Sequence, residues 1–331
     1  MIYSVQFLRG VAAFSVLVYH GSMKAIYFNE DHLLSDFSIG NSGVDLFFII
    51  SGFIMFHIAS LKQLTPYLFL RARVIRIMPL YWFLSFAALV AYLIAPQLVN
   101  SSGGNTDVLA SFFLWPTGEK YLINNGWTLT YEFFFYFSFA LVLSQTFRVK
   151  LISICLFYAL LVLAGNLSTP SHPTVVFFTS PILLEFMLGG VVFYMFKNKF
   201  LGQSWSLILI SVGLLLLLYQ NFVGMQTTPL GRFVYYGVPL FLISVGTISL
   251  EKKFFNMRPF LRDSVLLLGN ISYSLYLVHP FSLVIVYKVC QYMLPSIDAN
   301  VFLLISVFVS IGASYLVYRV IEKPLIQYFN S

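Results

Sequence analysis

Two ionisable side chains, Arg9 and His20, lie in the first apolar segment of the chain. If the segment is helical, the eleven steps between them bring His20 to within about 20° of Arg9, on one face and about 16 Å further along the axis. Ionisable groups among apolar residues usually mark function, and an imidazole can act as a general base. The alternative is that Arg9 extends to lipid headgroups and that His20 only satisfies a neighbouring helix.

Two carboxylates, Glu132 and Asp45, are candidates to fix the tautomer of such a base and to stabilise its imidazolium form. Glu132 precedes the aromatic run Phe133–Phe135, a setting in which a carboxylate is either protonated or paired. His20 is the partner that we expect. Asp45 lies near the start of the second apolar segment, where a helix dipole favours negative charge. The sequence leaves open whether Asp45 only stabilises its helix or serves His20.

Arg73 and Arg76 form a pair of cations three residues apart, which places them on one helical face. Guanidinium groups bind phosphate oxygens in a two-pronged geometry, so the pair predicts an anion site. Plain anchoring of the chain at the cytoplasmic membrane surface is the alternative.

Other ionisable residues carry weaker signals. We expect His57 and Glu185 to pack or hydrogen-bond within the fold, and the role of His279 is ambiguous. Cys155 and Cys290 lie in apolar runs and predict neither a disulfide framework nor a metal site.

The composition defines the setting of these residues. Of 331 residues, 59% are hydrophobic and 9% are charged. Soluble domains average about a quarter charged residues, so a water-facing globule is excluded. The sequence predicts an all-α, polytopic integral membrane protein that forms one transmembrane domain over residues 1–331, with no appended soluble domain. We also expect the first apolar segment to remain in the mature protein, because it lacks a clear cleavage site.

A bilayer core needs about 20 apolar residues per helix. About ten segments qualify, and these are residues 5–27, 38–60, 77–98, 126–147, 150–167, 175–196, 204–222, 232–250, 264–287 and 300–321.

Basic residues predict the orientation of these spans. Fourteen Lys and Arg residues fall on the side of the two termini and four on the other side, which places both termini in the cytoplasm. The net charge of +7 thus reflects topology, and no nucleic-acid partner is predicted.

Several motifs occur in a fixed order along nearly the whole chain. It resembles the membrane-bound acyltransferase family 3, particularly the compact bacterial members that O-acetylate surface polysaccharides. The motifs that carry the resemblance are Arg9-x10-His20, Gly43-Val44-Asp45-Leu46-Phe47-Phe48-Ile49-Ile50-Ser51-Gly52-Phe53, Arg73-x-x-Arg76, Trp127-x-Leu129-x-x-Glu132, and Ser272-Tyr273-Ser274-Leu275-Tyr276 with His279.

The resemblance implies a multi-pass protein of the bacterial cytoplasmic (inner) membrane, with ten helices. It implies cytoplasmic acyl-CoA, acetyl-CoA in the first instance, as donor substrate, and no permanently bound cofactor. The implied acceptor is a hydroxyl of a surface or exported polysaccharide or of its lipid-linked oligosaccharide precursor. Membrane lipids and polysaccharide-assembly proteins are further expected partners. Arg9 and His20 are implied to be required for activity, and Arg73 and Arg76 to handle the donor.

These indications together predict an acyl transfer site. His20 is the expected general base, supported by Glu132 or Asp45, while Arg73 and Arg76 hold the CoA phosphates and Arg9 lines the route inward. Direct transfer and a covalent acyl-enzyme both remain open.

Two other classes of protein compete with this interpretation. A transporter or flippase of a lipid-linked sugar or small solute also needs charges within its spans, although no inverted repeat is evident. A non-catalytic scaffold would leave the Arg9 and His20 face unexplained.

Overall fold

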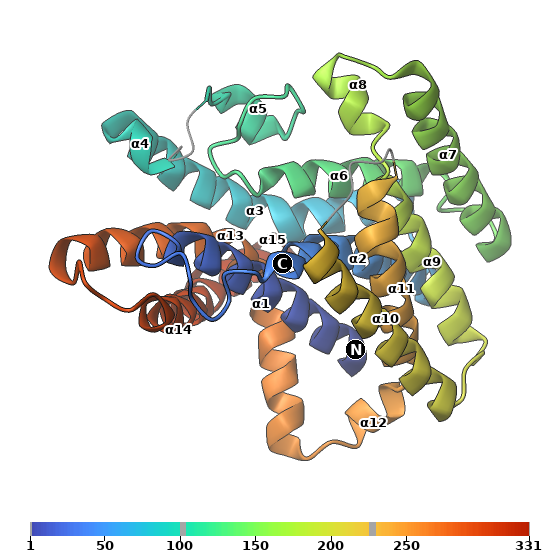
Figure 1. Cartoon of the computed structure of the whole chain (residues 1–331). Helices are drawn as coiled ribbons and strands as arrows, with labels where there is room; N and C mark the ends of the chain where they lie inside the picture. Colours follow the sequence, from blue (N-terminus) through green and yellow to red (C-terminus); the bar gives the residue numbers. More distant parts are fainter. Residues whose placement is uncertain (1, 100–103, 225–229, 331) are drawn as a thin grey trace.

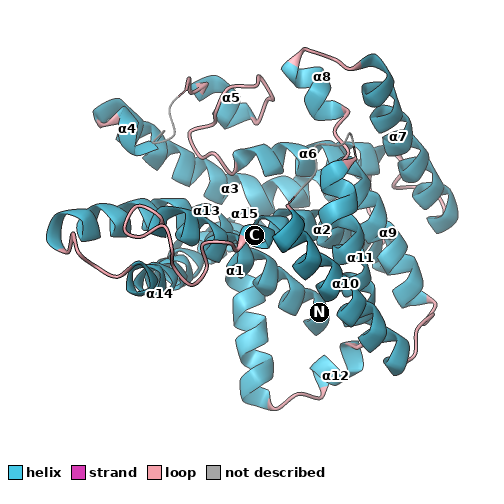
Figure 2. Ribbon diagram, in the orientation of Figure 1, coloured by secondary structure: helices cyan, strands magenta, loops and turns pink. Residues whose placement is uncertain are grey.

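The computed structural model describes residues 2–99, 104–224 and 230–330. Figure 2 shows helices joined by loops, and the β pairing in this part of the chain is a single isolated bridge between Thr106 and Lys120. The all-α prediction is therefore confirmed.

Ten longer helices fall on the ten predicted segments. They are α1 (Tyr3–Ala25), α2 (Gly43–Leu61), α3 (Pro66–Ile94), α6 (Gly126–Leu141), α7 (Phe147–Ser168), α9 (Leu183–Lys197), α10 (Gln203–Val223), α11 (Val238–Ser249), α13 (Pro259–Met293) and α14 (Ala299–Val317).

Shorter elements connect or extend these helices. They are η1 (Ser38–Ser42), α4 (Pro96–Val99), α5 (Val108–Phe113), α8 (Pro173–Phe178), the π-helical turn η2 (Phe233–Gly237), α12 (Glu251–Phe255), the π-helical turn η3 (Tyr318–Glu322) and α15 (Lys323–Asn330).

Within the described residues, seven helices are long and apolar enough to cross a membrane. The other three predicted spans correspond to α1, α6 and the 17-residue stretch Phe233–Ser249. Helices therefore stand where the apolar segments predict them, whereas ten membrane crossings and cytoplasmic termini stay predictions.

The boundary of the third segment differs from the prediction. Helix α3 begins at Pro66, eleven residues before the predicted start at 77, because local capping signals precede the apolar run. The Thr65 hydroxyl accepts a hydrogen bond from the Leu68 N–H at 3.3 Å, and Pro66 occupies the first turn, where its missing N–H costs nothing. Arg73 and Arg76 consequently lie within a continuous helix.

Close backbone contact joins α2 to α9. A Cβ atom on Gly52 would lie 2.2 Å from the carbonyl oxygen of Phe186, and one on Gly189 would lie 2.1 Å from that of Ile49. Both positions therefore need glycine for the two backbones to approach, as at many helix contacts in membranes.

Helices α1 and α13 pack side by side in a parallel direction, with α1 near the centre of the molecule (Figure 1). Gly10 of α1 faces Leu268, and Gly21, further along α1, faces Leu283 of α13. This pairing sets the face of α1 that carries Arg9 and His20 against the segment of α13 from Ser272 to His279.

Candidate functional site

A cavity of about 450 Å³ lies among α1, α2, α3, α6, α13 and α15. Four of the six residues that the sequence predicts for the site line it together. They are Arg9, Arg73, Arg76 and Glu132. Three guanidinium groups thus face one cavity with a single lining carboxylate among the described residues, which is an arrangement that attracts an anion.

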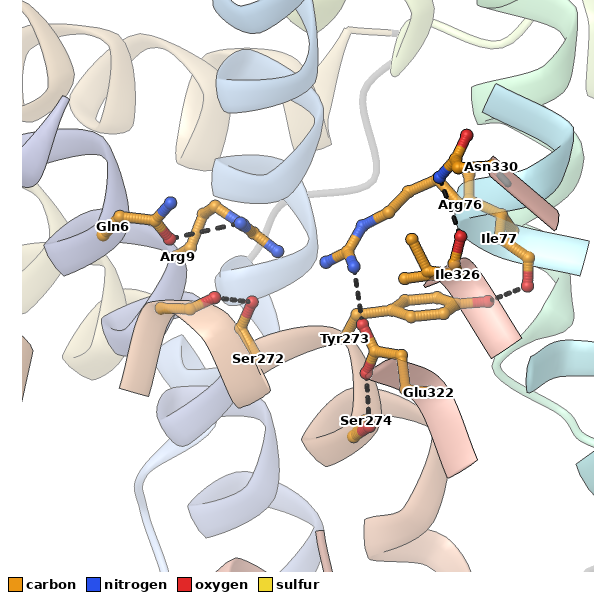
Figure 3. Close-up of polar contacts among 11 residues, drawn as sticks. Gln6, Arg9, Arg76, Ile77, Ser272, Tyr273, Ser274, Glu322, Ile326 and Asn330 are labelled. Carbon is orange, nitrogen blue, oxygen red and sulfur yellow. Dashed lines mark hydrogen bonds and ion pairs between the residues drawn. The ribbon is translucent and has the colours of Figure 1, made fainter. Parts of the chain in front are cut away.

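Arg76 is held by the π-helical turn η3. Its Nη1 donates to Oε1 of Glu322 at 2.7 Å, and Oε2 of Glu322 accepts from the Ser274 hydroxyl. Glu322 is almost fully buried. Figure 3 shows the guanidinium groups of Arg9 and Arg76 pointing toward each other across the site. The sequence analysis missed Glu322, although a carboxylate that ends an apolar run was an available signal.

Among the described residues, neither Arg9 nor Arg73 forms an ion pair with a carboxylate. Nη1 of Arg9 donates to the side-chain oxygen of Gln6 at 3.2 Å (Figure 3). The buried Nε of Arg73 has no hydrogen-bond partner among the described residues, and its guanidinium carbon lies 5.9 Å from the centre of the Phe69 ring. Both cations therefore keep donor groups for an anionic ligand.

Glu132 enters the same cavity from α6. Its Oε2 accepts a hydrogen bond from the Tyr136 hydroxyl at 3.1 Å, and that hydroxyl lies 3.4 Å from Oγ of Ser51. Glu132 therefore faces the arginines of the cavity and is bonded to Tyr136 rather than to His20.

Asp45 has a different partner from the one expected. Its two carboxylate oxygens accept from Nε and Nη2 of Arg232 at 2.8 Å and 2.7 Å, which is a two-pronged ion pair. Asp45 is fully buried in the first turn of α2 and does not line the cavity. The sequence placed Arg232 only among the outer basic residues, because nothing local indicates a contact across 187 positions.

His20 pairs with another histidine. Its Nδ1 lies 2.9 Å from Nε2 of His279, and the two ring planes are nearly parallel, with centroids 5.1 Å apart. The predicted pairing of His20 with Glu132 or Asp45 is thus wrong for this structure, because both carboxylates are bonded elsewhere. Sequence alone left His279 ambiguous because the contact depends on how α1 meets α13.

Tyr276 connects the histidine pair to the cavity. Neither His20 nor His279 lines the cavity, whereas Tyr276 does, and its ring centre lies 6.1 Å from that of His279. Phe47, which also lines the cavity, packs edge-on against Tyr276. The site therefore combines a cationic cavity with a histidine pair on the far side of one tyrosine.

Comparisons with known proteins agree on one family. A family model described as an acyltransferase domain matches residues 2–319. The chain is 32% identical over 305 residues to the exopolysaccharide production protein ExoZ of Rhizobium meliloti, an alignment that covers 88% of this chain and 91% of ExoZ. It is 26% identical over 359 aligned positions to the O-acetyltransferase OatA of Staphylococcus aureus, covering 96% of this chain but only 56% of OatA. No solved structure matches the chain.

The Asp45–Arg232 ion pair generates a stability prediction. Arg232→Met leaves a fully buried carboxylate without its counter-charge, so we expect the protein to lose about 3–5 kcal/mol of stability. The double variant Asp45→Asn/Arg232→Met removes both charges and should recover much of that loss. Thermal unfolding in detergent micelles measures both effects.

The matched control is Arg71→Met, which changes an exposed arginine whose side chain donates a hydrogen bond to the Phe329 carbonyl oxygen. It should shift stability by no more than about 0.5 kcal/mol. An Arg232→Met variant as stable as this control would show that the ion pair does not hold α2 and η2 together.

Proposed function

From the premise that the chain belongs to the acyltransferase 3 family, and is therefore a membrane acyltransferase, we propose that it is an O-acetyltransferase. It takes the acetyl group from acetyl-CoA and transfers it to a hydroxyl of an exported polysaccharide or of its lipid-linked precursor. The protein acts in the bacterial cytoplasmic membrane, with polysaccharide-assembly proteins as candidate partners.

The observation that carries this proposal is the cavity with three arginines. Coenzyme A bears phosphate groups, and guanidinium forks bind phosphate oxygens with good geometry. Arg73 and Arg76 lie on one face of α3 and line the cavity together with Ile326 and Asn330 of α15. In the proposal, these two arginines bind the phosphates.

The remainder of the cavity suits the uncharged part of the donor. Its wall includes Phe47, Ile50 and Ile54 of α2 and Leu129 of α6. The pantetheine arm of CoA is flexible and carries only amide and hydroxyl groups besides its thiol. It can run along this apolar wall past Arg9 toward Tyr276, which brings the thioester to the side on which the histidines lie.

His20 is the proposed general base. It takes the proton of the acceptor hydroxyl as that oxygen attacks the thioester carbonyl carbon. The carbon–sulfur bond then breaks, and the sulfur leaves with a proton returned by the imidazolium, so that acetyl ester and free CoA are the products. In this scheme Glu132, which is bonded to Tyr136 among the arginines, balances the positive charge of the donor site. Asp45 contributes by stabilising the fold through its ion pair with Arg232.

The names of the relatives support the choice of acceptor and acyl group. ExoZ is described as an exopolysaccharide production protein and OatA as an O-acetyltransferase. This chain spans about half the length of OatA. We therefore propose for it only an acyl transfer that a membrane acyltransferase domain can perform.

A binding experiment tests the donor site. Arg73→Gln removes a cation whose buried Nε has no partner among the described residues. We expect it to weaken acetyl-CoA binding by about tenfold or more, since a hydrogen bond to a charged group is worth about 1.5–3 kcal/mol. Calorimetry on protein in nanodiscs measures the affinity.

The control for that variant is Arg71→Gln, two residues earlier on the same helix and outside the cavity lining. Its affinity for acetyl-CoA should equal that of the unmodified chain. Equal losses in both variants would point to general surface charge and against a donor site at Arg73.

A transfer experiment tests the proposed activity. Proteoliposomes receive labelled acetyl-CoA on one side and a polysaccharide acceptor on the other. His20→Ala should lower turnover by about 10²–10⁴-fold, the usual contribution of a positioned base. His57→Ala is the control, because His57 packs on the Phe53 ring outside the cavity. Normal turnover in folded His20→Ala, or sugar movement without acetyl transfer, would contradict the proposal.

A further inference from the structure

The ring of His279 is bonded through both of its nitrogens. Nδ1 lies 2.9 Å from the carbonyl oxygen of Leu275, one helical turn earlier, and Nε2 lies 2.9 Å from Nδ1 of His20. The side chain is fully buried, and its ring plane is within 15° of that of His20. Both the orientation and the tautomer of His279 are therefore constrained by its surroundings.

The Leu275 carbonyl decides which nitrogens carry protons. A carbonyl oxygen can only accept, so Nδ1 of His279 is protonated and donates to it. A neutral imidazole has one N–H, which leaves a lone pair on Nε2 of His279. Nδ1 of His20 must then donate to that lone pair, and Nε2 of His20 remains unprotonated.

The opposite arrangement would require a doubly protonated His279. That ring would be a fully buried cation whose hydrogen bonds, in the part of the chain that the structure describes, reach no carboxylate. Burying an unpaired charge is costly, and more so within a membrane. The neutral arrangement is the one that the contacts favour.

We propose that His279 is the positioning residue for His20, holding it in the Nδ1–H tautomer so that its Nε2 is free to take the acceptor proton. This rests on the proposed function of His20 as the base. In serine hydrolases a carboxylate performs the same task for the catalytic histidine. Here a neutral ring performs it and brings no additional charge between the helices, while Glu132 and Asp45 serve elsewhere.

The first test reads the tautomer directly and does not depend on activity. Nitrogen-15 NMR of histidine-labelled protein in nanodiscs distinguishes protonated from unprotonated ring nitrogens. The chain has five histidines, and the His20 signals are assigned by their loss in His20→Ala. We expect His20 to carry its proton on Nδ1, and to shift toward the Nε2–H form in His279→Leu. Wild-type His20 in the Nε2–H form would overturn the proposal.

The second test separates positioning from packing. His279→Leu keeps apolar bulk but removes the acceptor, and should lower kcat by about 10²-fold or more, as expected when a base loses its correct tautomer. The Kd for acetyl-CoA should stay within about twofold, because the arginines of the cavity are untouched. In His279→Gln the amide oxygen can take the place of Nε2, and kcat should recover to within about tenfold of wild type.

The control is His57→Leu, the same substitution at a histidine outside the cavity, which should leave kcat unchanged. A folded His279→Leu with normal kcat, or a His279→Gln as inactive as His279→Leu, would overturn the positioning role. Failure of the wild-type chain to transfer acetyl groups would instead contradict the proposed function, whatever the NMR spectra show.

Discussion

The free-energy cost of placing charged side chains among membrane helices determines how the ionisable groups of this structure are paired. Asp45 is matched by Arg232, and Arg76 by Glu322, each through hydrogen bonds of 2.7 Å. Arg9 and Arg73 have no such carboxylate bonded to them in the described residues, yet both line the same cavity. A cavity that keeps unmatched guanidinium groups away from lipid is well suited to an anionic ligand, because the ligand supplies the missing counter-charge.

Because α1 packs in parallel against α13, groups suited to acid–base chemistry lie beside that cavity. Arg9 lines the cavity, and His20 meets His279 about three turns further along α1. Tyr276 of α13 touches both regions. One helix pair therefore carries both Arg9, which lines the donor cavity, and the histidine pair that we assign to proton transfer. Helices rather than loops set the spacing between these groups.

Much of this arrangement follows from local sequence. Apolar length alone located the helices, since lipid demands long apolar stretches. Periodicity placed Arg9 with His20 on one face, and the spacing of Arg73 and Arg76 placed them on another; the structure brings three of these four into one cavity with Glu132. The start of α3 was missed because the charges at Arg71, Arg73 and Arg76 dilute the apolar signal, although Thr65 and Pro66 carried the capping signal.

The partners of the buried groups could not be derived in the same way. His20 meets a residue 259 positions away, and Asp45 one 187 positions away. Such contacts depend on which helices pack together, and a single sequence carries no local trace of that choice. Charge complementarity suggested carboxylates for His20, but Glu132 is bonded to Tyr136 and Asp45 to Arg232, and the uncharged His279 takes that position.

A structure with a non-transferable acetyl-CoA analogue tests the central claim most directly. The account predicts that cryo-electron microscopy will show the phosphates bound by Arg73 and Arg76, with the acetyl group beyond Arg9 on the side of Tyr276 and His20. Density for the analogue outside the arginine-lined cavity, or an acetyl group pointing away from the histidine pair, would contradict it.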